Sequence, residues 1–120
     1  MSTTVQLQGV IADHVAGVNA FDTDAIMATF ADDALVNDNH REFWGTDRIR
    51  DWIEAEMVGD HVTIEPVEAV EHHGMTIVRG RYDGDYDKAG LPGELILTNY
   101  FEVENDRIVS LFVIRNRPTE

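Results

Sequence analysis

The sequence predicts one α+β domain, in which three N-terminal helices pack on one face of a strongly curved, mainly antiparallel sheet. In the first half of the chain, apolar residues recur at the spacing of an amphipathic helix. In the second half, apolar and polar residues alternate as they do in strands, and short turns separate the alternating runs. The 120 residues therefore form a single domain, residues 1–120, in the order helix, helix, short strand, helix and four-stranded antiparallel meander.

Two helices and a short strand are predicted at the start. The first helix covers about residues 4–20, and Asp22 is the expected N-cap of a second, shorter helix. The pair Asp32-Asp33 ends this second helix, and a short strand follows from Ala34 to Asp38. The apolar row of the first helix carries Leu7, Ile11, Val15, Val18 and Phe21, and that of the second carries Ile26, Met27 and Phe30.

A third helix is predicted to begin at Thr46. Its hydroxyl suits an N-cap, and Asp47 falls in the first turn, where a negative charge is favourable. The expected buried face of this helix carries Ile49, Trp52, Ile53 and Met57.

Four longer strands are predicted at 62–71, 75–86, 94–104 and 107–115. The alternation of the first changes phase at Pro66, which indicates a bulge or an edge position. Gly80 and Gly84 indicate strong curvature or the close approach of another element. The connecting turns are His73-Gly74, the segment from Ala89 to Gly93, and Asn105-Asp106.

The last strand is apolar on both of its faces. Helices cover one face of such a strand, so we expect a second subunit on the other and a homodimer through the sheet. The two predicted faces carry Ile108, Phe112 and Ile114 on one side and Val109, Leu111 and Val113 on the other. A curved sheet around a few helices leaves a cone with an open mouth, which is a natural pocket for a small molecule.

The composition excludes several classes of function. The formal charge is −14, from 23 acidic and 9 basic residues, and such a surface repels nucleic acid and anionic membranes. The acidic surface keeps the protein soluble, or it is an adaptation to a salty cytoplasm. There is no cysteine, so disulfides and thiolate sites are excluded. No apolar run reaches the length of a membrane span, and we expect neither a signal peptide nor a location other than the cytoplasm.

Three polar side chains are turned inward by the hydrophobic pattern. His14 lies in the apolar row of the first helix, Asp38 ends the short strand, and Asn99 lies in the apolar row Leu95-Leu97-Asn99-Phe101-Val103. Buried polar groups are costly unless they pair with one another or serve a ligand. They are therefore the candidate functional residues, although Asn37-Asp38-Asn39 also has the composition of a turn.

Two stretches resemble the nuclear-transport-factor-2-like superfamily. They run from Phe21-Asp22-Thr23-Asp24-Ala25-Ile26 to Phe30-Ala31-Asp32-Asp33-Ala34, and from Gly45 to Ile49. The closing strand pair around Arg107-Ile108-Val109 extends the likeness over nearly the whole chain. This resemblance implies a cone-shaped fold. Members include ketosteroid isomerases, SnoaL-like polyketide cyclases, dehydratases, epoxide hydrolases and proteins without catalysis, so the fold alone does not determine the activity.

Within the superfamily, the stretch from Val10 to Asn39 resembles ketosteroid isomerase. The resemblance places Asp38 at the position of the general base. His14 falls where that enzyme has an oxyanion-hole tyrosine, and Asn99 falls where it has a protonated aspartate. Both oxyanion donors are thus replaced in this chain. A carboxylate near His14 would fix the imidazole's orientation, or the imidazole would donate to a substrate oxygen.

We therefore expect binding of a small, mostly apolar molecule that carries a carbonyl or hydroxyl group. The expected reaction is proton transfer of the isomerase, cyclase or dehydratase type, with Asp38 as base and with His14 and Asn99 polarising the substrate oxygen. The expected substrate contacts are Phe30, Trp52, Tyr82, Phe101 and Phe112.

Two alternatives remain open. In one, the chain is a non-catalytic binding or dimerisation module, and the His-Asp-Asn triplet is an internal hydrogen-bond network. In the other it is an epoxide hydrolase, which needs water between two carboxylates and an arginine; the sequence indicates no second inward acid. We expect no cofactor and no metal, because Asp38, His40 and His14 lack the spacing of a ligand set.

Overall fold

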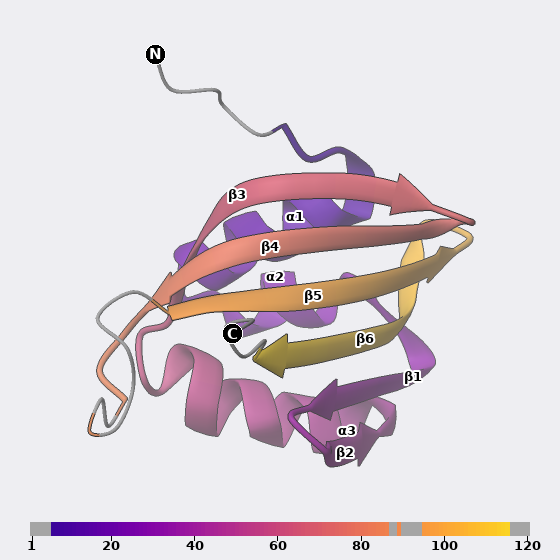
Figure 1. Ribbon diagram of the computed structural model, residues 1–120. Helices are drawn as coiled ribbons and strands as arrows, with labels where there is room; N and C mark the ends of the chain where they lie inside the picture. Colours follow the sequence, from indigo (N-terminus) through magenta and orange to yellow (C-terminus); the bar gives the residue numbers. More distant parts are fainter. Residues whose placement is uncertain (1–5, 87–88, 90–94, 116–120) are drawn as a thin grey trace.

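The computed structural model describes residues 6–86, 89 and 95–115, which form helices and one sheet (Figure 1). The sheet has six strands in the order β2-β1-β6-β5-β4-β3. Strands β3 to β6 form the predicted antiparallel meander, whereas β1 lies parallel to β6 and antiparallel to β2. The elements are α1 (Gly9–Asn19), α2 (Thr23–Met27), β1 (Phe30–Asp38), β2 (Arg41–Trp44), α3 (Gly45–Trp52), the π-helical segment η1 (Ile53–Val58), β3 (Thr63–His72), β4 (Met75–Asp83), β5 (Leu95–Glu104) and β6 (Arg107–Arg115).

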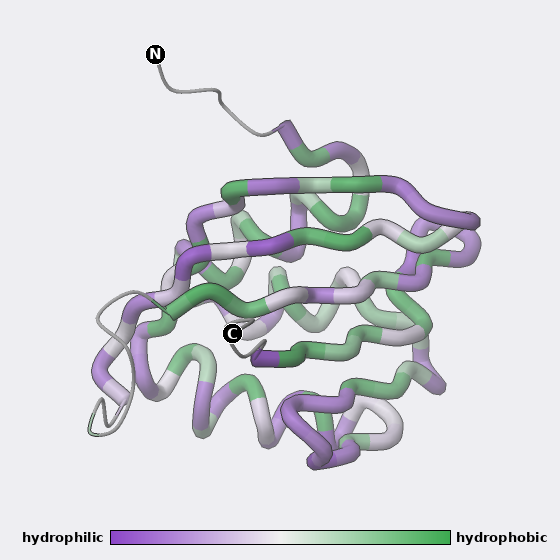
Figure 2. The backbone as a smooth tube through the Cα atoms, in the orientation of Figure 1, coloured by the Kyte–Doolittle hydropathy of each residue, from purple (hydrophilic) through white to green (hydrophobic). Residues whose placement is uncertain are grey.

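The helices and the concave face of the sheet enclose one hydrophobic core. Helices α1 and α2 lie across one face of β3 to β6, and α3 lies beside β1 and β2 (Figure 1). Strand β6 is hydrophobic along most of its length (Figure 2). The predicted α+β class is confirmed, although α2 has only five residues. In the described ranges, no helix is both long enough and apolar enough to cross a membrane.

Helix α1 is fixed to the edge of the sheet by its last residue. The side-chain oxygen of Asn19 accepts a hydrogen bond from the backbone N–H of Ile64 at 2.7 Å. Its side-chain nitrogen donates to the carbonyl of the same residue at 3.0 Å. The amide thus pairs with edge strand β3 as another strand would, and this holds the helix that carries His14 over the sheet.

The first half differs from the predicted boundaries. Helix α1 starts at Gly9, and Phe30 begins β1 instead of lying in the second helix. The expected break at Asp32-Asp33 is an irregular section inside β1, where its pairing with β6 shifts. Helix α3 begins at Gly45 with no side-chain cap, so the predicted Thr46 cap is wrong. Asp22 does cap α2, by accepting a hydrogen bond from Ala25 N–H at 3.1 Å.

Strand β2 was not predicted, because it has no buried row. Its four residues are exposed or half-buried. It pairs with β1 through the tight turn Asn39-His40, where both residues have positive φ angles (49° and 77°).

The strands and turns in the second half of the chain agree more closely with the prediction. β3 is the edge strand, and its register shifts after Pro66. A Cβ on Gly80 would lie 2.7 Å from the Ile64 side chain, which is the predicted close approach. The turns His73-Gly74 and Asn105-Asp106 are tight, with positive φ at every residue. The predicted turn from Ala89 to Gly93 lies almost wholly outside the described residues.

The prediction for the last strand is wrong in its phase. An extra residue, Val109, interrupts the pairing of β6 with β5, since Val103 faces Ile108 and Glu102 faces Ser110. A bulge of this kind reverses the alternation. Ile108, Leu111 and Val113 are therefore all buried, whereas Ile114 on the other face is 41% exposed.

Candidate functional site

A cavity of about 170 Å³ lies between the sheet and the helices. His14, Asp38 and Asn99 all line it, as do Trp52 and Tyr82. The rest of its wall is mainly apolar, and the acids among the lining are Asp38, Glu56 and Asp60. The other lining residues are Met57, Val62, Ile64, Tyr86, Leu95, Leu97, Leu111 and Val113.

The sheet register places Asp38 and Asn99 in one row. Val113 of β6 pairs with Asp38 of β1 on one side and with Asn99 of β5 on the other. Residues paired across a sheet point to the same face, and neighbouring strands lie roughly 4.8 Å apart. The two Cα atoms are therefore roughly 10 Å apart on the face that α1 covers.

His14 is buried, with 2% of its surface exposed. Its Nδ1 lies 3.3 Å from the hydroxyl oxygen of Thr29, and the rings of Phe30 and Phe101 meet it edge-on at centroid distances of 5.5 Å. Burial lowers the pKa of His14 from 6.5 to about 4, because a charged ring would lose its hydration. The side chain is therefore neutral at pH 7.

Asn99 and Tyr82 form a buried pair on adjacent strands. The Tyr82 hydroxyl donates to the Asn99 side-chain oxygen at 2.8 Å. The Asn99 side-chain nitrogen donates to the carbonyl of Val78 at 3.4 Å, a long hydrogen bond. Burial raises the pKa of Tyr82, although its hydrogen bond to Asn99 opposes this shift. Tyr82 therefore keeps its proton and acts as a neutral group.

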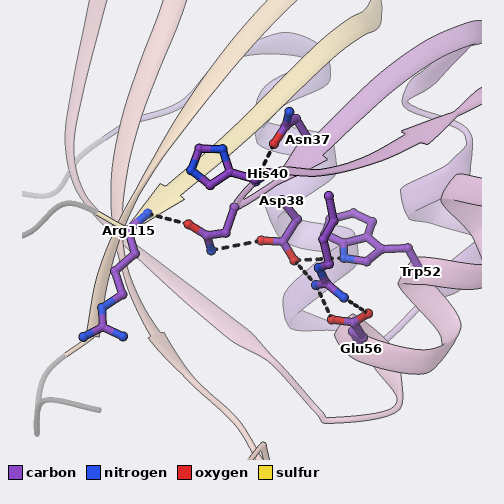
Figure 3. A network of polar contacts seen from close by, with 8 residues as sticks. Asn37, Asp38, His40, Trp52, Glu56 and Arg115 are labelled. Carbon is purple, nitrogen blue, oxygen red and sulfur yellow. Dashed lines mark hydrogen bonds and ion pairs between the residues drawn. The ribbon is translucent and has the colours of Figure 1, made fainter. Parts of the chain in front are cut away.

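Asp38 lies at the edge of the cavity, where three side chains hold its carboxylate (Figure 3). Its Oδ2 accepts hydrogen bonds from Arg41 at 2.7 Å and from the indole N–H of Trp52 at 3.2 Å. Its Oδ1 accepts from the side-chain nitrogen of Asn39 at 3.3 Å. The Asp38 side chain is 17% exposed, so solvent and cavity both reach it.

Arg41 connects the β1–β2 hairpin to η1. Its two terminal nitrogens bind the two carboxylate oxygens of Glu56 at 2.8 and 2.7 Å, and one of them also binds Asp38. Hydrogen bonds to Glu56 first, and then to Asp38, raise the pKa of Arg41 despite some burial. The hairpin and η1 thus meet in one ion-pair cluster at the cavity (Figure 3).

The structure brings together five of the eight predicted site residues. His14, Asp38, Asn99, Trp52 and Tyr82 line the cavity, but Phe30, Phe101 and Phe112 do not. Phe30 and Phe101 pack against the ring of His14 instead. Phe112 is half-buried on the opposite face of β6 from its neighbours Leu111 and Val113, which face the cavity.

Two expectations about the polar groups are corrected. His14 is oriented by Thr29, and among the described residues no hydrogen bond joins it to Asp38. A second inward acid does exist, since Glu56 and Asp60 line the cavity with Asp38. Glu56 was detectable in the sequence, because it lies four residues after Trp52 and thus on nearly the same helical face.

Four residues of the site were missed: Thr29, Arg41, Glu56 and Asp60. Thr29 and Arg41 carry no signal in the hydrophobic pattern. Within the part of the chain that the structure describes, no three His, Asp or Glu side chains are grouped to hold a metal ion, and His40 is exposed in its turn.

Comparison with known proteins places this geometry in a family. The SnoaL-like domain family matches residues 11–111. A putative polyketide cyclase from Sinorhizobium meliloti is 26% identical and superposes with a TM-score of 0.80, over 90% of this chain and 95% of that one. No curated protein matches the chain.

Two further structures show the same fold at lower identity. A nuclear-transport-factor-2-like protein of unknown function from Cytophaga hutchinsonii is 12% identical, with a TM-score of 0.74 over 97% of this chain and 95% of that one. A protein with a ketosteroid isomerase-like fold from Catenulispora acidiphila, in complex with trimethylamine, is 18% identical. Its TM-score is also 0.74, over 95% of this chain and 88% of that one.

Proposed function

Because this chain belongs to the SnoaL-like domain family, we propose that it binds a small, mostly apolar molecule in the cavity and moves a proton on it. The observation that carries the proposal is the convergence of His14, Asp38 and Asn99 on one cavity with a largely apolar wall. The related protein from Catenulispora acidiphila holds a small molecule, trimethylamine, in its crystal structure.

The size of the cavity favours a ligand with one ring. An apolar cavity of about 150 Å³ holds a benzene molecule, and the cavity here has about 170 Å³. Trp52, Leu97 and Val113 supply apolar contacts, while the polar groups lie at separate points of the wall. This arrangement suits a ring that carries one or two oxygen atoms.

We assign the proton transfer to Asp38. Its carboxylate takes a proton from a carbon beside a carbonyl group and returns it to the same carbon, or to the former carbonyl carbon where the first carbon bears a hydroxyl that becomes the new carbonyl, so no oxidant or reductant is needed. The Trp52 N–H and the Arg41 guanidinium hold the carboxylate in place. The contacts with a hydroxyl oxygen of the substrate are assigned to His14 and Asn99, both buried in the wall of the cavity.

The exchange of a carbon-bound proton with solvent tests this assignment. 2-Hydroxycyclohexanone carries both a carbonyl and a hydroxyl, and the hydrogen on the hydroxyl-bearing carbon beside the carbonyl exchanges in D₂O when a base removes it. We expect the protein to accelerate this exchange, as followed by proton NMR, and Asp38→Asn to reduce the acceleration by about 100-fold or more.

The matched control is Asp33→Asn. Asp33 is an exposed acid on the same strand as Asp38 and does not line the cavity, so its variant should exchange the probe at the wild-type rate. Asp38→Asn should also retain the affinity for the probe. Full exchange activity in Asp38→Asn would end the assignment of Asp38 as base.

The second candidate is a binding module without catalysis. Hydrogen bonds within the protein already engage each member of the triplet: His14 with Thr29, Asn99 with Tyr82, and Asp38 with Arg41. In this case the protein would bind the probe without speeding its exchange, and Asp38→Asn would mainly lower the melting temperature.

A further inference from the structure

The hydrogen bonds of Thr29 determine which nitrogen of His14 carries the hydrogen. The Thr29 hydroxyl has one hydrogen, and at 2.6 Å from the carbonyl of Ile26 it is donated to that oxygen. A carbonyl cannot donate, so this direction is fixed. The hydroxyl oxygen must then accept the bond from Nδ1 of His14 at 3.3 Å. The neutral ring therefore carries its hydrogen on Nδ1, and Nε2 is left with a lone pair.

That lone pair opens onto the cavity. His14 makes no hydrogen bond through Nε2 to any described residue. No side-chain nitrogen or oxygen in the described ranges is both fully enclosed and without a partner, so Nε2 must reach accessible space. Since His14 is 2% exposed and lines the cavity, the cavity supplies that space. His14 thus offers an acceptor to a ligand and no donor.

Asn99 offers the complementary group. The carbonyl of Val78 can only accept, so the amide nitrogen of Asn99 must be the atom that faces it. The amide oxygen is then the atom that receives the Tyr82 hydroxyl. The amide nitrogen keeps a second hydrogen. Because His14 and Asn99 line the same cavity, a fixed acceptor on α1 and a donor on β5 are both available to its ligand.

We propose that this pair recognises a hydroxyl group of the substrate, so that the cavity prefers a small cyclic molecule with a hydroxyl at this point over one with only a ketone or ether oxygen there. The ligand O–H donates to Nε2 of His14, and its oxygen accepts from the amide of Asn99. A ketone or an ether would set oxygen lone pairs against Nε2 and leave that nitrogen unpaired and dehydrated. The inference rests on the proposed function and names the ligand class of the same cavity.

Binding of three probes of similar shape tests the proposal. These are cyclohexanol, cyclohexanone and methoxycyclohexane, each titrated into the protein and followed by NMR chemical shifts. We expect cyclohexanol to bind about tenfold more tightly than the other two, because binding of either of the others leaves a buried polar group without its partner.

Thr29 supplies the variant that separates this role from a structural one. Thr29→Val removes the acceptor for Nδ1, so the ring can carry its hydrogen on either nitrogen, and the preference for cyclohexanol should fall to less than about threefold. Thr29→Ser keeps the hydroxyl and should keep the preference. Nitrogen-15 spectra of the imidazole should show hydrogen on Nδ1 in the wild type and in Thr29→Ser.

The outcomes are distinct. Equal binding of cyclohexanol and cyclohexanone by the wild type, or an Nε2–H ring in its spectra, overturns the hydroxyl selection while the small-molecule cavity stands. Failure of all three probes to bind overturns the proposed function and the selection with it. A tenfold preference that Thr29→Val removes and Thr29→Ser retains supports the selection.

Discussion

His14 combines a polar ring with an almost fully buried site. Its pKa is lowered to about 4 by loss of hydration, and Phe30 and Phe101 enclose it edge-on. The Thr29 hydroxyl gives one ring nitrogen a partner, which offsets part of the cost of burial. A residue of this kind makes stability depend on pH, because in mild acid the imidazole is protonated in the unfolded chain and stays neutral in the folded protein.

The direction of that dependence follows from the two pKa values. The pKa is 6.5 in the unfolded chain and about 4 in the fold, so the unfolded state binds more protons between these values. The contribution of His14 to stability is complete above pH 6.5 and is lost as the pH falls toward 4. The loss in the free energy of unfolding between pH 7 and pH 5 amounts to about 2 kcal/mol.

Urea unfolding at both pH values measures this loss. The free energy of unfolding differs between pH 7 and pH 5, and this difference should be about 2 kcal/mol smaller in His14→Gln than in the wild type. His72→Gln, which replaces an exposed histidine, should leave the difference unchanged. An identical pH dependence in His14→Gln and the wild type would show that the buried ring is not responsible.

Side-chain direction could be read from the sequence, but hydrogen-bond partners could not. Helical and strand periodicity turned His14 and Asn99 inward, and both are buried. Their partners Thr29 and Tyr82 lie 15 and 17 residues away in the chain. Periodicity tells which face a residue occupies within its own element. Pairing with Thr29 depends on how α1 packs on the turn after α2, which no local pattern encodes.

At the scale of the elements, the sequence-based prediction is wrong where a local irregularity changes the regular period of a strand or helix. One extra residue, Val109, moves Ile108 to the same face as Leu111 and Val113. The π-helical segment η1 likewise departs from the regular helical period and carries Glu56, which binds the β1–β2 hairpin through Arg41. A prediction that assumes a constant period anticipates neither the bulge at Val109 nor the π-helical geometry of η1, although it does place Glu56 on nearly the same helical face as Trp52.

Asn19 carries an energetic prediction at this scale. Its amide forms two hydrogen bonds with the backbone of Ile64 and so joins α1 to β3. Asn19→Ala leaves both partly buried backbone groups without these partners and should lower the free energy of unfolding by about 1–3 kcal/mol in urea denaturation. Gln8→Ala, at the opposite end of α1, where no side-chain hydrogen bond caps the helix, should have little effect. Equal stabilities of the two variants would contradict the role of Asn19.

The whole molecule has two unequal sheet faces. The concave face is filled by helices and contains the cavity, whereas Ile114 on the opposite face is 41% exposed and Trp44 of β2 is 61% exposed. Exposed apolar side chains that gather on one face of a sheet are typical of an interface. The charge of −14 acts in the opposite sense, because two copies of such a chain repel each other at low salt.

We therefore expect a homodimer through the outer face of the sheet that tightens as salt is added. Ile114→Glu places a further charge in this face and should shift the protein to the monomer in sedimentation equilibrium. Phe21, in the turn between α1 and α2, provides the matched control, since it is 40% exposed and Phe21→Glu adds the same charge on the helical side of the sheet. A Phe21→Glu variant that dissociates as readily as Ile114→Glu would point to charge repulsion in general. An Ile114→Glu variant with the wild-type mass would exclude this face as the interface, because an unpaired carboxylate buried there costs several kcal/mol and no dimer of modest affinity would survive it.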